Sequence, residues 1–267
     1  VYKRQLLSRP KLRTFKHNDT DALKRVLESN RGAHETTIVG VDGVYSMDGD
    51  IAPLPEIVDI AKRYDAMVFV DEAHATGVIG EKGRGTPSHY DLEGQVDIVA
   101  GTLSKAIGQL GGFIASSREI VNYLRCFARS YFFSTSLPPV VVASILAGLD
   151  IMENDPEIHI NLWKNIEYFK KNVTDLGFEI VENTESAIIP VIIGEETKLK
   201  KMSKRLHDEG LYVNPIPYPA VPRDKTRFRF SVMASHTKKD MDDALEILEK
   251  VGLEFGVIQN KSKQNLV

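Results

Sequence analysis

The sequence predicts an α/β fold with a mostly parallel sheet covered by helices on both faces, followed by a smaller α+β domain. From residue 36 to about residue 115, short apolar runs alternate with helical or loop stretches, which is typical of buried parallel strands. Beyond residue 150 the order changes to two strands, a helix, two strands and a helix, which favours a separate α+β unit. We therefore expect a large domain over residues 1–150 and a small domain over residues 151–267.

The large domain is expected to contain three apolar strands, over 36–41, 66–70 and 96–101. A helix is expected between the first two strands because apolar residues recur there on one helical face, at Leu54, Ile57, Val58 and Ala61. Prolines in the first turn suit this helix. The segment 80–95 is rich in glycine and is expected to form a long loop.

Helices dominate the middle of the chain. One is expected near 118–128, and a second should follow Pro138–Pro139. A long amphipathic helix comes next, with an apolar stripe at Leu162, Ile166, Phe169, Val173 and Leu176. The small domain then follows, with expected strands over 178–181, 187–193, 211–214 and 227–232 and helices over 195–209 and 238–251.

Composition argues against several classes of protein. The net charge of −3 gives no electrostatic footprint for nucleic acid, and no apolar run is long enough to predict a membrane span. Cys126 is the single cysteine, which excludes an intramolecular disulfide and favours a cytoplasmic location. Because the chain opens at Val1 and its first methionine is Met47, we expect an N-terminal part to be missing.

Polar side chains follow three consecutive predicted strands. Ser46 comes after the first strand, Asp71 and His74 after the second, and the segment from Thr102 to Lys105 after the third. Each interval has room for one crossover connection, so these groups should meet at the carboxyl edge of the sheet, where open α/β sheets bind ligands. One histidine and one aspartate make a poor metal site, so no metal is expected. An amine, a carboxylate, an imidazole and a hydroxyl instead suit pyridoxal phosphate.

The run DEAH, residues 71–74, also allows an alternative. In DEAH-box nucleoside triphosphatases such a run holds a magnesium ion, but these proteins need a phosphate-binding loop with a Gly-Lys pair. That dipeptide occurs nowhere in this chain, and this alternative gives Lys105 no role.

Four segments together resemble one family. They are the stretch from SMDGD to DEAHATG (46–77), GTLSKAIG (101–108), RSYFFSTSLPP (129–139) and YPAVPRDKTRFRFSVMASHT (218–237). In this order they resemble the α-oxoamine synthases, pyridoxal-phosphate-dependent transferases of fold type I that join an amino acid to an acyl-CoA. The resemblance extends over essentially the whole chain.

The resemblance implies roles for the residues at the strand ends. Lys105 matches the lysine that forms a Schiff base with the cofactor, and Asp71 matches the carboxylate that pairs with its pyridinium nitrogen. His74 matches the imidazole near the phenolic oxygen and is expected to take part in proton transfer. Ser46 matches a serine that contacts the cofactor, and Thr102 matches a phosphate ligand.

The resemblance also implies a partner subunit. Ser134 and Thr135 match the pair that reaches the phosphate of the neighbouring subunit's cofactor, which predicts a homodimer with shared active sites. Arg229 matches the arginine that binds the amino-acid carboxylate, a task that suits a planar guanidinium. Arg227 is expected on the same strand face as Arg229, so only the alignment with the family assigns carboxylate binding to Arg229 rather than to Arg227. Glu72 is expected to be structural, and His236 has no assigned role.

Within the family, several substrates stay open. GTLSKAIGQLGGF and FSTSLPP resemble 8-amino-7-oxononanoate synthases, which use alanine and pimeloyl thioesters, and this is the leading interpretation. The segments around Ala220 and Arg229 resemble bacterial serine palmitoyltransferases, and SMDGDIAPL with EFGVI resembles glycine C-acetyltransferase. A non-catalytic partner subunit is the alternative of another class, although Asp71, His74 and Lys105 are all present.

Overall fold

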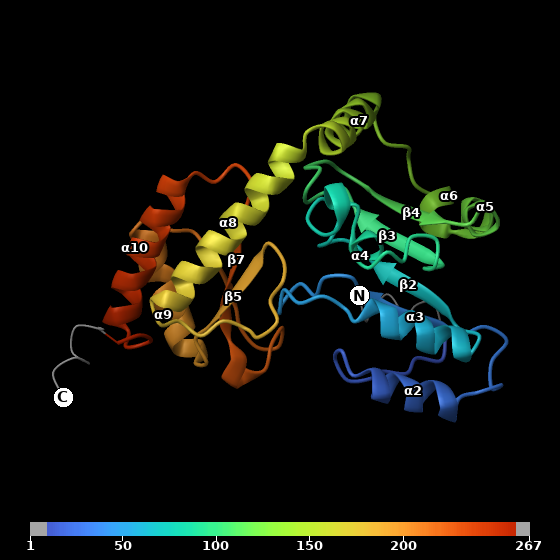
Figure 1. Ribbon diagram of the computed structural model, residues 1–267, viewed down its shortest axis with the longest axis horizontal. Coiled ribbons are helices and arrows are strands. Elements are labelled where there is room, and N and C mark those ends of the chain that lie inside the picture. The colour runs from blue at the N-terminus through green and yellow to red at the C-terminus, as the bar shows by residue number, and fades with distance from the viewer. Residues whose placement is uncertain (1–9, 260–267) are drawn as a thin grey trace.

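The computed structural model describes residues 10–259 and contains two sheets (Figure 1). A four-stranded sheet has the order β1-β2-β3-β4, and a three-stranded sheet has the order β5-β7-β6. Each sheet packs against its own cluster of buried apolar residues. The α/β class predicted from the sequence is confirmed. The boundary expected after residue 150 falls inside helix α7 (Pro139–Asn154).

The four-stranded sheet is mostly parallel. Strands β1 (Ile38–Asp42), β2 (Met67–Asp71) and β3 (Ile98–Thr102) run parallel, and β4 (Gly112–Ser116) pairs antiparallel with β3. The three parallel strands were predicted and begin one or two residues later than expected. β4 was not predicted, because three of its first four residues are apolar without alternation and its burial is low throughout.

Helices α2 (Thr20–Ser29) and α3 (Leu54–Arg63) pack together beside β1 and β2. The residues predicted to form the apolar face of α3 are all at most 1% exposed, namely Leu54, Ile57, Val58 and Ala61. Pro53 precedes the helix and Pro55 lies in its first turn, where a missing N–H costs nothing. The prediction for this helix is therefore confirmed.

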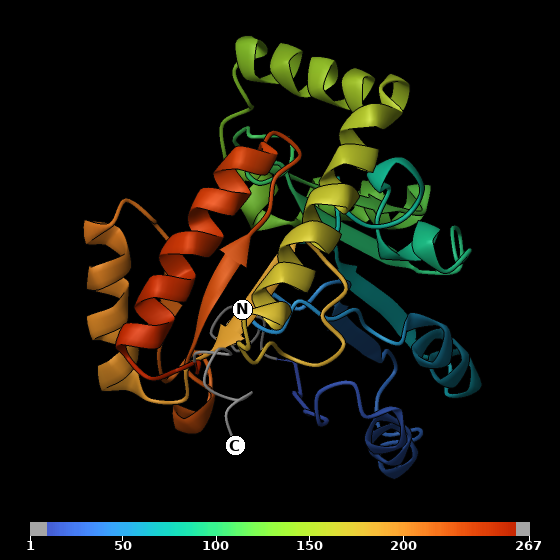
Figure 2. The same cartoon turned by 60° about the vertical axis from the view of Figure 1, so that its left-hand side comes forward.

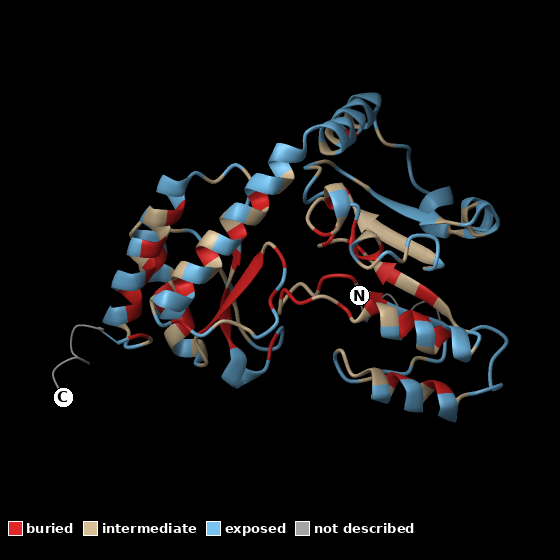
Figure 3. Cartoon of the chain, in the orientation of Figure 1, coloured by how far each residue is buried: buried red, intermediate tan, exposed pale blue. Residues whose placement is uncertain are grey.

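The segment expected to be a long loop contains two short helical turns, η1 (Glu81–Gly83) and α4 (Thr86–His89). Helices α5 (Arg118–Phe127), α6 (Arg129–Phe132) and α7 follow β4 and have few buried residues (Figure 3). Several large apolar side chains on these helices or directly after them face solvent, among them Phe127, Phe132 and Phe133.

The second sheet is antiparallel. Strands β5 (Ile188–Ile192), β6 (Asn214–Ile216) and β7 (Arg227–Ser231) form it, and the turn η2 (Arg223–Lys225) precedes β7. Helices α8 (Pro156–Asp175), α9 (Glu196–Asp208) and α10 (Lys238–Glu254) supply the apolar residues that pack on it (Figure 2).

Two strand predictions in this part were wrong in detail. The segment 178–181 forms only an isolated bridge, between Ile180 and Val191, because the chain turns at Asn183 with a φ of 57°. The strand expected over 211–214 begins at Asn214 instead. Residues 211–213 precede the strand, lie outside the sheet and line a hollow beside α10.

Polar contacts join the two sheets next to the loop that follows β1. The hydroxyl of Thr184 donates to the carbonyl of Asp48 at 2.9 Å, and that of Ser186 donates to the carbonyl of Gly49 at 2.8 Å. Gly49 has a φ of +73°, and a Cβ there would lie 2.6 Å from the carbonyl oxygen of Ile188. This close approach brings β7 to the carboxyl ends of β1 and β2. No helix within residues 10–259 is long and apolar enough to cross a membrane.

Candidate active site

Strand register brings the predicted groups to one edge of the large sheet. Asp42, Asp71 and Ala100 are paired across β1, β2 and β3, so two carboxylates end neighbouring strands. Thr102 lies two residues beyond Ala100, at the end of β3. The expectation that consecutive strand ends deliver polar groups to one place therefore holds in the structure.

A tight turn after β2 places His74 near Asp71. One oxygen of the Asp71 carboxylate accepts the Ala73 N–H at 2.9 Å, and the carbonyl of Glu72 accepts the N–H groups of Ala75 and Thr76. The pKa of His74 is lowered to about 4, mainly by burial, then by the positive charges of Lys105 and Arg229, against the opposing effect of Asp71. His74 is therefore a neutral imidazole at neutral pH, with one ring nitrogen that can donate a hydrogen bond and one that can accept a hydrogen bond.

Lys105 is exposed in the turn after β3. Its carbonyl accepts the N–H of Gly108 at 3.0 Å, which closes that turn. Among residues 10–259, its side chain forms no hydrogen bond or ion pair, although its charge lowers the pKa values of Asp42 and His74. Its amine is therefore near both groups and free to react.

Two hydroxyls lie beside Lys105. Thr102 Oγ1 and Ser104 Oγ are 2.8 Å apart, and the N–H of Ser104 donates to Thr102 Oγ1 at 3.3 Å. Thr102 Oγ1 also donates to the carbonyl of Gly111 at 3.3 Å, which fixes its position against the turn that leads to β4. A pair of hydroxyls near an amine is a suitable site for a phosphate group.

The two arginines of β7 have different surroundings. Arg227 is 3% exposed and donates to the Asp48 carboxylate at 2.6 Å and to the Met47 carbonyl at 2.9 Å. Arg229 donates only to the Ser46 carbonyl, at 3.1 Å, and its buried Nε has no partner among the described residues. Arg227 is thus fully engaged in joining the sheets, whereas Arg229, near His74, forms no ion pair within residues 10–259.

We call Ser46, Asp71, His74, Thr102, Lys105 and Arg229 the strand-end cluster. Ser134 and Thr135 do not belong to it, because they lie exposed in the segment between α6 and α7. No contact in the described part of the chain joins them to the cluster.

Sequence reasoning missed Asp42. Burial raises the pKa of this carboxyl, Asp71 raises it further, and Lys105 and His17 oppose the shift. A signal existed, because Asp42 directly follows the predicted strand 36–41. The sequence did not indicate a partner for His17. In the structure its Nε2 is hydrogen-bonded to Asp50 Oδ2 at 2.7 Å, and its ring lies edge-on to Tyr45.

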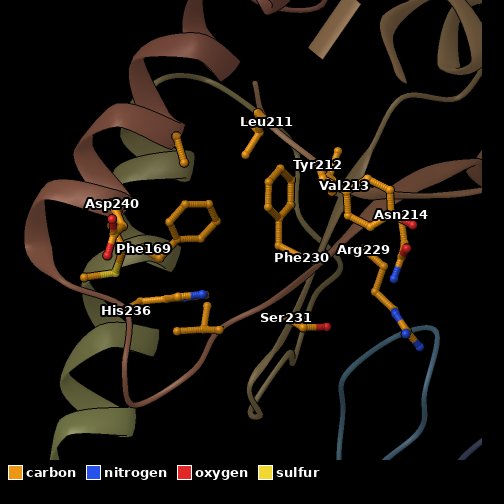
Figure 4. A pocket seen from close by; sticks show the side chains of 13 residues that line it. Phe169, Leu211, Tyr212, Val213, Asn214, Arg229, Phe230, Ser231, His236 and Asp240 are labelled. Atoms are coloured by element: carbon orange, nitrogen blue, oxygen red, sulfur yellow. The ribbon is translucent and has the colours of Figure 1, made fainter. Parts of the chain in front are cut away.

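A hollow of about 360 Å³ lies elsewhere, between β7 and α10 (Figure 4). Phe169, Tyr212, Phe230 and His236 line it. Arg229 is its one lining residue from the strand-end cluster, and Figure 4 shows this side chain directed away from the aromatic rings. The hollow is thus separate from the strand ends, where the reactive groups meet.

The chain belongs to the family of class I and II aminotransferases, whose family model matches residues 6–248. It is 46% identical over 252 residues to the 8-amino-7-oxononanoate synthase of Symbiobacterium thermophilum. The match covers 94% of this chain and 64% of that protein, so the chain spans just under two thirds of the length of this curated relative.

Solved structures give the same result. A serine palmitoyltransferase with pyridoxal phosphate bound as its internal aldimine superimposes with a TM-score of 0.87 at 38% identity, covering 91% of this chain and 61% of that one. The 8-amino-7-oxononanoate synthase of Francisella tularensis superimposes with a TM-score of 0.79 at 27% identity, covering 94% and 71%. The resemblance to α-oxoamine synthases drawn from the motifs is confirmed.

Proposed function

We propose that the protein is a pyridoxal-phosphate-dependent acyltransferase, which condenses an amino acid with an acyl-CoA and releases CoA and, with decarboxylation, an α-aminoketone. The observation that supports this most strongly is the convergence of Lys105, Asp71 and His74 at the carboxyl edge of a parallel sheet in a chain similar to α-oxoamine synthases. A non-catalytic subunit would have no use for a lysine amine left free beside a neutral imidazole.

The donor set fits pyridoxal phosphate. Lys105 supplies an unpaired amine for the aldehyde carbon, Asp71 a carboxylate for the ring nitrogen, and Thr102 a hydroxyl for the phosphate. Ser46 and His74 complete the contacts that we assign to the cofactor. When bound, pyridoxal phosphate supplies an electron-accepting ring that stabilises negative charge at the α-carbon of the amino acid.

The residues of the strand-end cluster have separate roles in binding the amino acid and in proton transfer. Arg229 binds and orients the amino-acid carboxylate with its free guanidinium N–H groups. The amine of Lys105 accepts the α-proton of the bound amino acid, because Lys105 and Arg229 both act on His74 and so lie at the same site. His74 is neutral and can exchange a proton with the acyl oxygen or the phenolic oxygen. The carboxylate of Asp71 lies at the end of β2 beside these groups, where it can pair with the ring nitrogen.

Among the possible substrates, we propose alanine and a pimeloyl thioester. This choice rests on the 46% identity to proteins named 8-amino-7-oxononanoate synthase, against 38% to the serine palmitoyltransferase. Serine with palmitoyl-CoA is the second candidate, because the superposition on serine palmitoyltransferase is the closer of the two described above. Glycine with acetyl-CoA is the third.

A substrate panel tests the proposal. The natural full-length protein, loaded with pyridoxal phosphate, is given alanine, serine or glycine with pimeloyl-, palmitoyl- or acetyl-CoA, and release of the CoA thiol is measured. We expect turnover with alanine and pimeloyl-CoA. Turnover with serine and palmitoyl-CoA alone would transfer the assignment to the second candidate, and no turnover with any pair would contradict the proposed activity.

The assembly and the domain division belong to the same proposal. We propose a cytoplasmic homodimer in which Ser134 and Thr135 reach the partner's cofactor phosphate. Both are exposed and lie within a segment rich in exposed aromatic side chains. We also propose that residues 1–150 are part of a cofactor-binding domain and that residues 151–267 form a small domain, since each sheet has its own core.

A further inference from the structure

The loop after β1 presents two consecutive carbonyl groups to the two arginines of β7. The carbonyl of Ser46 accepts a hydrogen bond from Arg229 Nη1 at 3.1 Å, and the carbonyl of Met47 accepts one from Arg227 Nη1 at 2.9 Å. The two arginines are separated by one residue of the strand, so their side chains lie on the same face of the sheet. Alternate residues of β7 therefore bind consecutive residues of the loop.

The bond to Ser46 determines which edge of the Arg229 guanidinium stays free. Nη1 donates to the carbonyl of Ser46, whereas neither Nε, which is buried, nor Nη2 has a hydrogen-bond partner among residues 10–259. The N–H groups of Nε and Nη2 lie side by side on one edge of a guanidinium, and this edge can bind both oxygens of a carboxylate. Figure 4 shows the side chain of Arg229 extending away from the aromatic rings of the hollow. The Ser46 carbonyl thus leaves Arg229 with a free pair of donors.

Asp48 holds this loop against β7 through its carboxylate. Its Oδ1 accepts a 2.6 Å hydrogen bond from Nη1 of Arg227, the same nitrogen that donates to the carbonyl of Met47. Arg227 is only 3% exposed, and its Nε donates to the carbonyl of Lys225 at 2.9 Å, which fixes the guanidinium from the other side. The ion pair between Asp48 and Arg227 therefore restrains Met47, the residue directly after Ser46.

We propose that Asp48 is a positioning residue for the amino-acid substrate. By pairing with Arg227 it fixes the carbonyl of Ser46, and this carbonyl orients Arg229 so that its free edge receives the substrate carboxylate. The role rests on the proposed function of Arg229. Among residues 10–259, the carboxylate of Asp48 is hydrogen-bonded only to Arg227. Its negative charge by itself opposes the binding of another carboxylate nearby, so an effect through geometry and an effect through charge have opposite signs.

Four variants of the natural full-length protein test this role. Asp48→Asn removes the negative charge of the pair, and Arg227→Met removes the positive charge. Arg227→Lys keeps that charge, and because both contacts to the loop come from the single nitrogen Nη1, a lysine amine can replace them. Ser186→Ala is the matched control, since it removes a different hydrogen bond from the small domain to the same loop, at the carbonyl of Gly49.

Three quantities are measured for each variant. The dissociation constant for alanine is taken from titration of the cofactor absorbance, and the KM values for alanine and the acyl-CoA are taken from steady-state kinetics. Hydrogen–deuterium exchange of residues 45–50 is followed in the cofactor-free protein, together with thermal unfolding.

We expect Asp48→Asn and Arg227→Met to raise the dissociation constant and the KM for alanine by about fivefold, the range expected for the loss of one hydrogen bond. The KM for the acyl-CoA should change little. Exchange of residues 45–50 should become faster in both variants. Arg227→Lys should bind alanine like the wild type although it is less stable, and Ser186→Ala should lower stability without weakening alanine binding. In an Arg229→Lys background, Asp48→Asn should add little, because its effect on alanine passes through Arg229.

The proposal is overturned if Asp48→Asn binds alanine as tightly as the wild type or more tightly, because Asp48 would then act through its charge or not at all. It is also overturned if Ser186→Ala weakens alanine binding as much as Asp48→Asn, or if the effects of Asp48→Asn and Arg229→Lys are additive. A wild type that turns over no substrate pair, with alanine binding that responds as expected, would contradict the proposed activity alone. Turnover with unchanged alanine affinity in Asp48→Asn would contradict this inference alone.

Discussion

Two neighbouring carboxylates show how much a single residue depends on its surroundings. Asp71 ends β2 half-buried at the edge where Lys105 and His74 lie, whereas Glu72 is 1% exposed, lies between Gly43 and Gly85, and forms no ion pair in the described part of the chain. The first is placed to interact with a ligand, and the second is placed to hold the backbone. The two arginines of β7 differ in the same way, because Arg227 is buried against Asp48 whereas Arg229 has no ion-pair partner among residues 10–259.

Lys105 is the residue on which cofactor attachment depends. In the natural full-length protein, Lys105→Ala should abolish the aldimine absorbance band that added pyridoxal phosphate produces, because Lys105 supplies the amine that we assign to the cofactor aldehyde. Absorbance spectroscopy measures the band, and borohydride reduction with peptide mapping identifies the lysine that carries the cofactor. The control is Lys164→Ala, at an exposed site on α8. A reduced adduct that maps to another lysine would refute the assignment.

The two arginines should respond differently to the same change. Arg229→Lys keeps the charge but loses the planar fork, so we expect the KM for the amino acid to rise by about tenfold or more, with little change for the acyl-CoA. Arg227→Lys should instead lower the free energy of unfolding by about 1–3 kcal/mol, because it disturbs a buried pair. Steady-state kinetics and thermal unfolding distinguish them, and the reverse pattern would exchange the two roles.

His74 should titrate well below an ordinary histidine. Its pKa of about 4 in the folded protein lies below the reference value of 6.5, so protonation favours the unfolded state. The stability that neutral His74 contributes is therefore lost as the pH falls from about 6.5 towards 4. An NMR titration of the imidazole signal that His74→Asn removes should give a midpoint close to 4. A midpoint near 6.5 would contradict the burial and the positive charges described here.

At the scale of elements, the loop between β1 and α3 determines how the two sheets meet. It contributes Ser46, Asp48 and Gly49, and each of these contacts a residue of the small sheet or its flanking loop. This loop and β7 together complete the strand-end cluster, because Arg229 reaches it only from the other sheet.

Gly49 therefore should not tolerate a side chain. Gly49→Ala adds a Cβ at a φ of +73° and 2.6 Å from a backbone oxygen, so we expect a loss of about 2–4 kcal/mol in the free energy of unfolding. Gly94→Ala is the matched control, since Gly94 has a φ of +78° but no atom within 4 Å of the added Cβ. Its cost should be about 1 kcal/mol. Equal losses in denaturant unfolding would show that the contact between sheets contributes nothing.

At the scale of the whole molecule, the exposed apolar side chains lie mainly along one continuous part of the chain. Phe127 and Phe132 are each 66% exposed and Phe133 is 81% exposed, and Val140 and Leu146 continue this surface on α7. Exposed apolar surface of this extent marks an interaction site. Its position beside Ser134 and Thr135 supports the proposed homodimer.

Complementation between inactive subunits tests the shared site. Lys105→Ala and the double variant Ser134→Ala/Thr135→Val should each be inactive alone in the natural full-length protein. Co-expressed, they should recover about one quarter of the wild-type activity, because random pairing leaves one intact site in half of the dimers. The control is a co-expressed pair of subunits that each carry all three substitutions, because such dimers contain no intact site. No recovery in mixed dimers, with dimer formation verified by ultracentrifugation, would place Ser134 and Thr135 in their own subunit's site.

The sequence by itself determined the parallel strands, the apolar face of α3 and the order of Ser46, Asp71, His74 and Lys105 along the chain. These follow from local patterns, because period and strand length are properties of neighbouring residues and parallel strands end at the same edge. Only the tertiary structure distinguished Arg227 from Arg229, placed Asp42 beside Asp71 and buried Glu72 with no ion pair among the residues that the structure describes. Arg227 is buried against Asp48, which is remote from it in sequence. Glu72 is enclosed by Gly43 and Thr86, which lie in turns that hydrophobic periodicity does not predict. The two arginines therefore acquire their roles from contacts that form only when the two sheets pack. Glu72 acquires its role from contacts that form only when β2, the loop after β1 and α4 come together.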